Sequence, residues 1–111
     1  MKDVNKMILL GRLGADPVLR HTKTGAPFAH FPVATGRKFK KEDEQEADEW
    51  IEETQWHNIV AWGKQGENCA QYLKKGSAVY IEGAVRTRRY EGKDGISRMS
   101  YDVHAEEVSF V

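Results

Sequence analysis

The chain has 111 residues, of which 40% are hydrophobic, and these values favour a single globular domain spanning residues 1–111 with a modest core. Its only cysteine, Cys69, excludes an internal disulfide and favours a reducing, cytoplasmic compartment. The sequence has no apolar stretch long enough for a membrane-spanning helix, and its first residues lack the pattern of a secretory signal.

The formal net charge of zero, from 17 basic and 17 acidic residues, conceals an uneven distribution. Eight of the acids lie between Glu42 and Glu53, a stretch that contains no basic residue. The remaining chain holds 9 acids against 17 bases, a balance of +8. This distribution is compatible with a body that binds a polyanion, while the acidic run (about residues 40–53) is interpreted as a solvated loop.

Alternating apolar residues predict strands in the first part of the chain. The first strand is expected at Val4–Leu13, and Asp16-Pro17 marks the turn that follows it. Val18–His21 is expected as a short extended piece, and Thr24-Gly25 is a candidate hairpin turn. Pro27–Lys38 alternates clearly and is predicted as the second main strand.

The middle of the chain predicts a third main strand and a helix. Pro32 predicts that part of the second strand lies at an edge or a bulge. A charged loop is expected at Lys40–Glu52, and the third strand at Thr54–Trp62. Lys64–Lys75 carries a small apolar stripe at helical spacing, and Gly76 is expected to end that helix.

Two further segments complete the predicted architecture. Ala78–Tyr90 is predicted as a long strand, Asp94-Gly95 as a turn, and Ile96–Val111 as one strand or a pair of strands. Three strands, a helix and two strands is the order of the OB-fold. The expected fold class is therefore all-β, a five-stranded Greek-key barrel with one helix between strands three and four.

A basic strand gives the first indication of function. In an extended Ala78–Tyr90, the side chains of Arg86, Arg88 and Tyr90 share one face. Two guanidinium groups and a ring on one face suit a strand of nucleic acid, with cations for phosphates and an aromatic surface for bases. A solvated edge strand that carries charges against aggregation explains the same residues equally well.

Two tryptophans on the third strand add a second indication. Alternation in Thr54–Trp62 places Trp56 and Trp62 on one face, with Ile59 and Ala61 on the other. If the side of the strand that carries Trp56 and Trp62 packs into the core, both rings have a structural role. If Ile59 and Ala61 face the core, the two rings form an exposed stacking platform beside the basic strand. The residues alone leave both alternatives open.

Three segments of the chain resemble the bacterial single-stranded DNA-binding proteins. They are V-N-K-M-I-L-L-G-R-L-G-A-D-P at Val4–Pro17, T-Q-W-H-N-I-V-A-W-G-K at Thr54–Lys64, and Y-L-K-K-G-S-A-V-Y-I-E-G-A-V-R-T-R-R-Y at Tyr72–Tyr90. They cover the chain nearly end to end, in order and at compatible spacing. The resemblance implies an OB-fold, single-stranded DNA binding with little sequence preference in replication, recombination and repair, a homotetramer, and a place at the bacterial nucleoid.

The resemblance also implies roles for individual residues of this chain. The DNA-stacking aromatics correspond to Phe39, Trp56, Trp62 and Tyr90. The phosphate-binding cations correspond to Lys6, Lys64, Lys74, Lys75, Arg86, Arg88 and Arg89. His57 corresponds to a histidine that supports the subunit interface in the family, although a purely structural histidine is an equal alternative. No cofactor is implied.

The chain departs from the family pattern at several places. The family more often has Trp at the positions of Phe39 and Tyr90 and Phe at that of Trp62, and Asn58 stands where Arg is common. The segment between Phe39 and Trp56 is a few residues longer than usual and contains an extra aromatic, Trp50. Family members usually continue into a flexible tail that recruits replication and repair proteins. This sequence stops at Val111, so recruitment through such a tail is not expected of it.

Catalytic and metal-binding motifs are missing from the sequence. The four histidines and the single cysteine do not have the spacing of zinc ligands. Nucleophile-elbow, P-loop and His-Glu-x-x-His motifs are absent too. The protein is therefore expected to be a binding protein rather than an enzyme, without a metal. The alternative function is that of a primosomal or phage-type OB-fold module that acts mainly in protein assembly.

Overall fold

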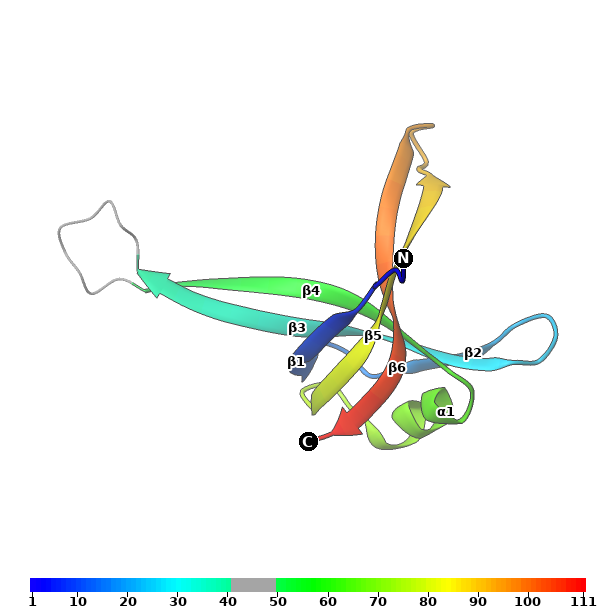
Figure 1. Ribbon diagram of the computed structural model, residues 1–111, viewed down its shortest axis with the longest axis horizontal. Helices are drawn as coiled ribbons and strands as arrows, with labels where there is room; N and C mark the ends of the chain where they lie inside the picture. Colours follow the sequence, from blue (N-terminus) through cyan, green and yellow to red (C-terminus); the bar gives the residue numbers. More distant parts are fainter. Residues whose placement is uncertain (41–49) are drawn as a thin grey trace.

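The computed structural model describes residues 1–40 and 50–111 as six strands and one helix. The strands are β1 (Met7–Leu13), β2 (Val18–His21), β3 (Pro27–Lys40), β4 (Trp50–Trp62), β5 (Ala78–Glu91) and β6 (Ser97–Phe110). The helix α1 spans Gly63–Tyr72, between β4 and β5. Figure 1 shows how two hairpins, β3–β4 and β5–β6, reach out from the centre of the molecule in different directions.

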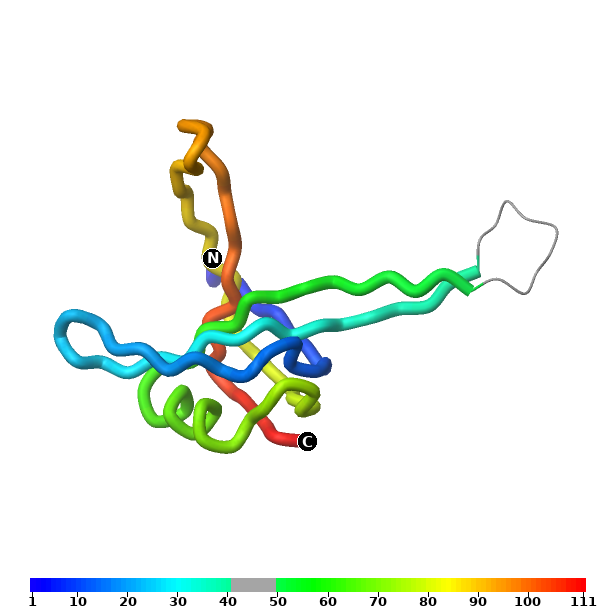
Figure 2. The backbone as a smooth tube through the Cα atoms, turned by 180° about the vertical axis from the view of Figure 1, so that it is seen from behind, coloured from blue at the N-terminus to red at the C-terminus, as the bar shows by residue number. Residues whose placement is uncertain are grey.

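Five strands close into a barrel. Neighbouring strands follow the order β1-β5-β6-β4-β3, and a pairing of Leu13 with Val33 joins β1 back to β3. All pairs are antiparallel except β4 and β6, which run parallel, with Ile59 paired with Val103 and Val60 with His104. The short β2 continues along β3 beyond β1 (Figure 2). This arrangement confirms the predicted five-stranded OB-fold barrel with its helix between the third and fourth barrel strands.

Alternating side chains from all five barrel strands fill the core. Its most buried members, at 2% exposure or less, include Phe31, Val33, Ile59, Ile81 and Val103. The helix adds Cys69, and Leu73 follows directly after it. Burial raises the pKa of the Cys69 thiol to about 11, so this thiol is protonated and unreactive at neutral pH. In the described part of the chain, no helix is long and apolar enough to cross a membrane.

The helix is shorter than the sequence predicts. The prediction of Lys64–Lys75 followed by a Gly76 stop is wrong at its C-terminal end, because α1 ends at Tyr72 and Leu73 already has extended backbone angles. Leu73 turns inward to the core, and the backbone of Lys75 is held by the Asp16 carboxylate at 2.7 Å. Gly76 instead lies in a turn with φ of 89°, and its own amide donates a hydrogen bond to the Leu13 carbonyl.

Other element boundaries also differ. Strand β1 begins at Met7 rather than Val4. Of the two possibilities for Ile96–Val111, the structure has the single strand Ser97–Phe110. The predicted loop Lys40–Glu52 is wrong at both of its ends, because Lys40 belongs to β3 and Trp50–Glu52 to β4. The rest of the acidic run, residues 42–49, lies outside the described residues.

Pro32 sits in the middle of β3 without disturbing the sheet. Its carbonyl accepts a hydrogen bond from the Gly14 amide, so its ring nitrogen faces the same side, away from β4. On that side, pairing with β2 ends at His30 and pairing with β1 begins at Val33. The structure thus replaces the predicted edge or bulge by a gap between two partner strands, where the missing N–H costs no ladder bond.

Candidate nucleic-acid interface

The two tryptophans of the third barrel strand point outward. Ile59 and Ala61 are fully buried, whereas Trp56 is 56% exposed and Trp62 43%. The structure thus places both rings on an exposed face, and the core-tryptophan interpretation is wrong, while stacking on nucleic-acid bases stays a prediction. The register places Phe28, His30 and Ala34 of β3 beside them on the same outer face.

The same outer face continues across the parallel pair onto β6 and β5. Val60 is opposite His104, and the register of β5 and β6 sets Arg86 opposite Asp102 and Arg88 opposite Ser100. We call this continuous outer surface the tryptophan face. Its principal side chains are Arg20, Phe28, His30, Trp56, Asn58, Trp62, Arg86, Arg88, Tyr90, Asp102 and His104. A groove of about 690 Å³ runs through its centre and is lined by Arg20, Phe28, His30, Asn58, Trp62, Arg88, Asp102 and His104, among others.

Trp62 is fixed at the centre of the face by its neighbours. Its ring centroid lies 4.9 Å from that of Phe28, and its indole N–H donates to Nδ1 of His104 at 3.2 Å. Because that nitrogen accepts, His104 is neutral in this arrangement. Burial lowers the pKa of His104, and the charge of Arg86 lowers it further, while Asp102 opposes both. The neutral ring is thus the stable form at neutral pH.

The Trp56 ring lies against Gly14, in the connection between β1 and β2. A Cβ atom added to Gly14 would come within 2.3 Å of the Trp56 ring, so only glycine leaves room for the indole here. Gly14 itself is tied to β3 through its amide bond to the Pro32 carbonyl. The ring therefore rests against a fixed surface, with more than half of its residue area open to solvent.

The arginines of β5 fall on two different faces. Arg86 and Arg88 belong to the tryptophan face. Asp102 is opposite Arg86 and forms an ion pair with Arg88, with an Arg88 Nε to Asp102 Oδ2 distance of 3.3 Å. Tyr90 follows on the same face, 46% exposed and opposite Arg98. Arg89 is opposite Met99 on the other face of the β5–β6 hairpin, so the structure does not bring it to the tryptophan face.

Phe39 also lies away from the two tryptophans. Its register partner is Ile51, whereas Trp56 is paired with Ala34, and the unbroken alternation of β3 puts Phe39 on the opposite face of the β3–β4 hairpin. The Arg37 guanidinium carbon lies 4.9 Å from the centroid of the Phe39 ring. The structure therefore does not group Phe39 with Trp56 and Trp62.

The four lysines singled out in the sequence are spread around the molecule. Lys64 is exposed in the first turn of α1, two residues after Trp62. Lys74 and Lys75 are exposed in the connection after α1, which Asp16 anchors close to Gly14 and hence toward the Trp56 end of the face. Lys6 forms an ion pair with Glu82 at 3.4 Å, on the outer surface of β1 and β5.

His57 points to the side opposite Trp56. It is half-buried, with a distance of 2.9 Å between its Nε2 and the Thr35 hydroxyl. Its Nδ1 is buried and has no hydrogen-bond partner among the described residues. Burial lowers the pKa of this imidazole. The position on the far side agrees with the sequence pattern, while its contact with another subunit stays a prediction.

Sequence reasoning missed several members of the tryptophan face. Phe28, Arg20 and His30 come from β2 and β3, where the Arg20 Nε donates to His30 Nε2 at 3.2 Å. Asp102 and His104 come from β6. The alternation of Ser100, Asp102 and His104 was the available signal, because it gives one polar face to the last strand.

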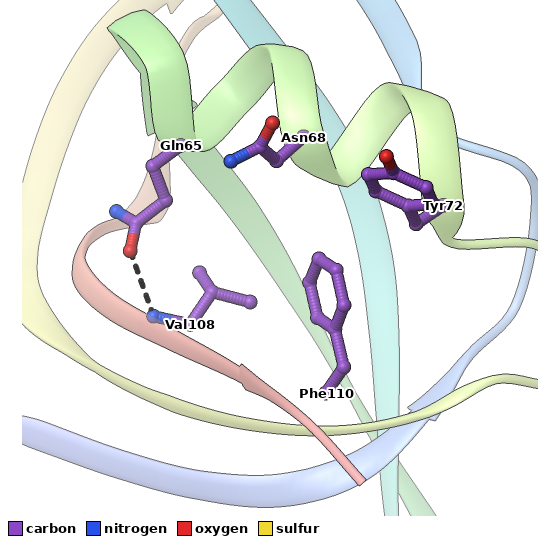
Figure 3. Close-up of a pocket in the computed structure, with 5 residues that line it drawn as sticks. All are labelled: Gln65, Asn68, Tyr72, Val108 and Phe110. Carbon is purple, nitrogen blue, oxygen red and sulfur yellow. Dashed lines mark hydrogen bonds between the residues drawn. The ribbon is translucent and has the colours of Figure 1, made fainter.

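A second depression lies between α1 and the end of β6, apart from the tryptophan face. Gln65, Asn68 and Tyr72 of the helix face Val108 and Phe110 across about 400 Å³ (Figure 3). Gln65 accepts a hydrogen bond from the Val108 amide at 2.9 Å, and its side-chain amide donates to the carbonyl groups of Ala105 and Glu106. Gln65 thus satisfies backbone groups of β6 beyond the point where β4 stops pairing with it.

Comparison with known proteins identifies the family of this chain. The model of the single-strand binding protein family matches residues 4–111. The chain belongs to this family. Single-stranded DNA-binding proteins of Neisseria meningitidis serogroups A and B are 44% identical to it over 108 residues, which is 97% of this chain and 60% of theirs. Single-stranded DNA-binding protein 3 of Clostridium acetobutylicum is 44% identical over 109 residues, 71% of its length.

A solved structure shares the whole fold. A structure described as a Plasmodium falciparum SSB complex with ssDNA superposes with a TM-score of 0.83 at 26% identity, covering 100% of this chain and 97% of that one. The chain spans about 60% of the length of its Neisseria relatives in the single-strand binding protein family. Among residues 1–40 and 50–111, no three His, Cys, Asp or Glu side chains gather as a metal site.

Proposed function

We propose that the protein binds single-stranded DNA with little sequence preference through the tryptophan face. The observation that carries the proposal is the union, on one outer surface, of exposed Trp56 and Trp62 with Arg86 and Arg88. Every base has a flat π-surface that can stack on an indole, and the guanidinium groups suit phosphates, so neither contact selects a sequence. Membership of the family and the likeness to a complex with ssDNA support the proposal.

The stacking residues of the proposal are Trp56, Trp62 and Tyr90. Phe28 backs Trp62 and extends the apolar area around it. Phosphate contacts come from Arg86 and Arg88 on the face, with Lys64, Lys74 and Lys75 at its two ends. The biological role would be protection of single strands in replication, recombination and repair, in the cytoplasm at the nucleoid. The protein acts by binding and not by catalysis.

Titration of the protein with oligo(dT) and with a duplex of the same length tests the proposal. We expect single strands to bind much more tightly and to quench tryptophan emission, because bases stack on Trp56 and Trp62. Equal affinity for the duplex, or no binding of oligo(dT) by folded protein, would contradict it. Failure of the folded protein to bind oligo(dT) would favour a module whose surface assembles other proteins.

We further propose that four copies assemble into a homotetramer. Ile8 and Leu10 are 57% and 66% exposed on β1, and between Met7 and Gly11 this strand pairs, within the described chain, with β5 alone. An unpaired sheet edge with exposed apolar side chains favours association with another copy. His57, half-buried on the side away from the tryptophan face, is the residue proposed to lie near a subunit contact. Light scattering at micromolar concentration is expected to give four times the 12.7 kDa mass of one chain, and a monomeric mass would refute the proposal.

A further inference from the structure

The outer half of the β3–β4 hairpin has two faces of different character. In residues 36–40 of β3, the only partner strand in the described chain is β4, so both faces of this arm lie outside the barrel. The register pairs Gly36 with Thr54, Lys38 with Glu52 and Lys40 with Trp50. These residues continue the face of Trp56 along the arm, because they are spaced from it by even numbers along an unbroken ladder.

Trp50 is the aromatic side chain of this face of the arm. It is 61% exposed, and the Lys40 ammonium nitrogen lies 5.3 Å from its ring centroid. Trp50, Lys38 and Glu52 line a shallow cavity of about 410 Å³. The exposed indole offers a surface for stacking, and the two lysines outnumber Glu52 among these four residues, so they leave positive charge for a phosphate.

Phe39 offers less on the opposite face. The guanidinium of Arg37 sits 4.9 Å from its ring centroid, and Arg37 is itself held by Glu53 at 3.2 Å. The ring is half-buried, unlike that of Trp50. Of the two aromatic rings on the arm, Trp50 is therefore the more open to solvent.

We propose that Trp50, with Lys38 and Lys40, forms a further stacking site for single-stranded DNA that extends the tryptophan face along the arm. The inference rests on the proposed function of that face. The residues of this face next to Trp56 are small (Ala34, Gly36 and Thr54), and the pair Lys38 and Glu52 lies between them and Trp50. Six residues of strand separate the two rings, which is about 20 Å at roughly 3.3 Å per residue. Stacked nucleotides about 3.4 Å apart would cover that distance with about six.

The length of the oligonucleotide separates this site from the main face. Trp62 to Trp56 is again six residues, so about six nucleotides reach across the main face and about twelve reach Trp50 as well. We therefore expect Trp50→Ala to weaken binding of (dT)16 by roughly 5- to 150-fold, the range for loss of one base stack. Binding of (dT)6 should change much less. Tyr72→Ala, which removes an exposed aromatic ring beside α1 and away from the arm, is the control and should leave both affinities unchanged.

The outcomes distinguish the two proposals. If the unaltered protein fails to bind either oligonucleotide, the proposed function fails. If it binds both, and Trp50→Ala either matches it on (dT)16 or loses as much affinity for (dT)6 as for (dT)16, the arm site is refuted. Photocrosslinking of the unaltered protein to (dT)16 carrying 5-iododeoxyuridine gives a result that does not depend on any variant folding. Cleavage after glutamate separates Trp50 from Trp56 and Trp62. Crosslinks to the peptide containing Trp50 are expected, and crosslinks confined to other peptides would overturn the proposal.

Discussion

Replacing Trp62 by alanine should weaken binding of oligo(dT) by about 1–3 kcal/mol, or roughly 5- to 150-fold in Kd. The reason is its position: the ring lines the groove, backed by Phe28 at 4.9 Å and oriented by the hydrogen bond from its N–H to His104. The pre-oriented ring can accept a base without first losing freedom of its own. Trp62→Phe keeps an aromatic surface but loses the N–H bond, so we expect a loss between those of the parent and the alanine variant.

The fold should survive this change. Trp62 is 43% exposed, so burial covers somewhat more than half of a side chain that can bury about 250 Å². At about 25 cal/mol per Å², that burial contributes at most about 3.6 kcal/mol of unfolding free energy, an upper bound because unfolded chains are partly compact. Binding must therefore be measured well below the unfolding midpoint of the variant, which thermal melting establishes.

Anisotropy of a fluorescently labelled oligo(dT) is the suitable assay, because tryptophan emission itself changes in the variant. Tyr72→Ala supplies the control: this ring is 62% exposed but packs near Phe110 beside the helix, away from the tryptophan face. Its affinity should equal that of the parent. If Trp62→Ala binds as tightly as Tyr72→Ala, the groove around Trp62 is not where bases stack.

Three further predictions concern salt, pH and stability. Arg86→Ala combined with Arg88→Ala should reduce the slope of log K against log salt for oligo(dT) by up to about 1.4, at about 0.7 per phosphate, whereas Arg89→Ala on the opposite face should leave it unchanged; equal slopes in all three proteins would contradict the assignment of faces. The pKa values of His57 and His104 are lower in the folded protein than in the unfolded chain, so protonation of either ring favours unfolding. Their contribution to the free energy of unfolding is therefore full above pH 6.5 and is lost as the pH falls through the lowered values. Urea midpoints measured from about pH 7.5 to 5 should show this loss, and His104→Gln should show a smaller one. Gln65→Ala should lower the free energy of unfolding by about 1–2 kcal/mol, because the Val108 amide loses its acceptor, while Gln71→Ala, exposed on the same helix, should have no effect in denaturant titration.

The barrel was predictable from the sequence because its strands alternate. Phe31 and Val33 on β3, and Ile59 and Ala61 on β4, all occupy the buried positions that period two assigns to them. The helix end was not, because Lys74, Lys75 and Gly76 are good C-terminal signals by themselves. Burial of Leu73 and the hydrogen bond from the Lys75 amide to Asp16 instead end the helix earlier, and both depend on residues distant in sequence.

The candidate site was predictable in part for a similar reason. Trp56 and Trp62 could be paired on one face within a single strand, but Phe39 belongs to the other strand of the hairpin. Its face depends on the register across the connection, and no local pattern fixes which residue is opposite Trp50. Asp102 and His104 were overlooked because only the parallel pairing of β6 with β4 brings them beside Trp62.

The glycine beneath Trp56 should stand apart in a survey of every substitution at every position. At Gly66 and Gly83, an added Cβ would run into a backbone carbonyl oxygen, at 2.3 Å from Ala61 and 2.4 Å from His104. Substitutions there should remove protein from the cell through misfolding and degradation. At Gly14, the added atom meets the ring of a surface residue that can swing aside. Its variants should accumulate to normal levels yet fail in selection for DNA maintenance, so abundance and fitness would diverge at this position.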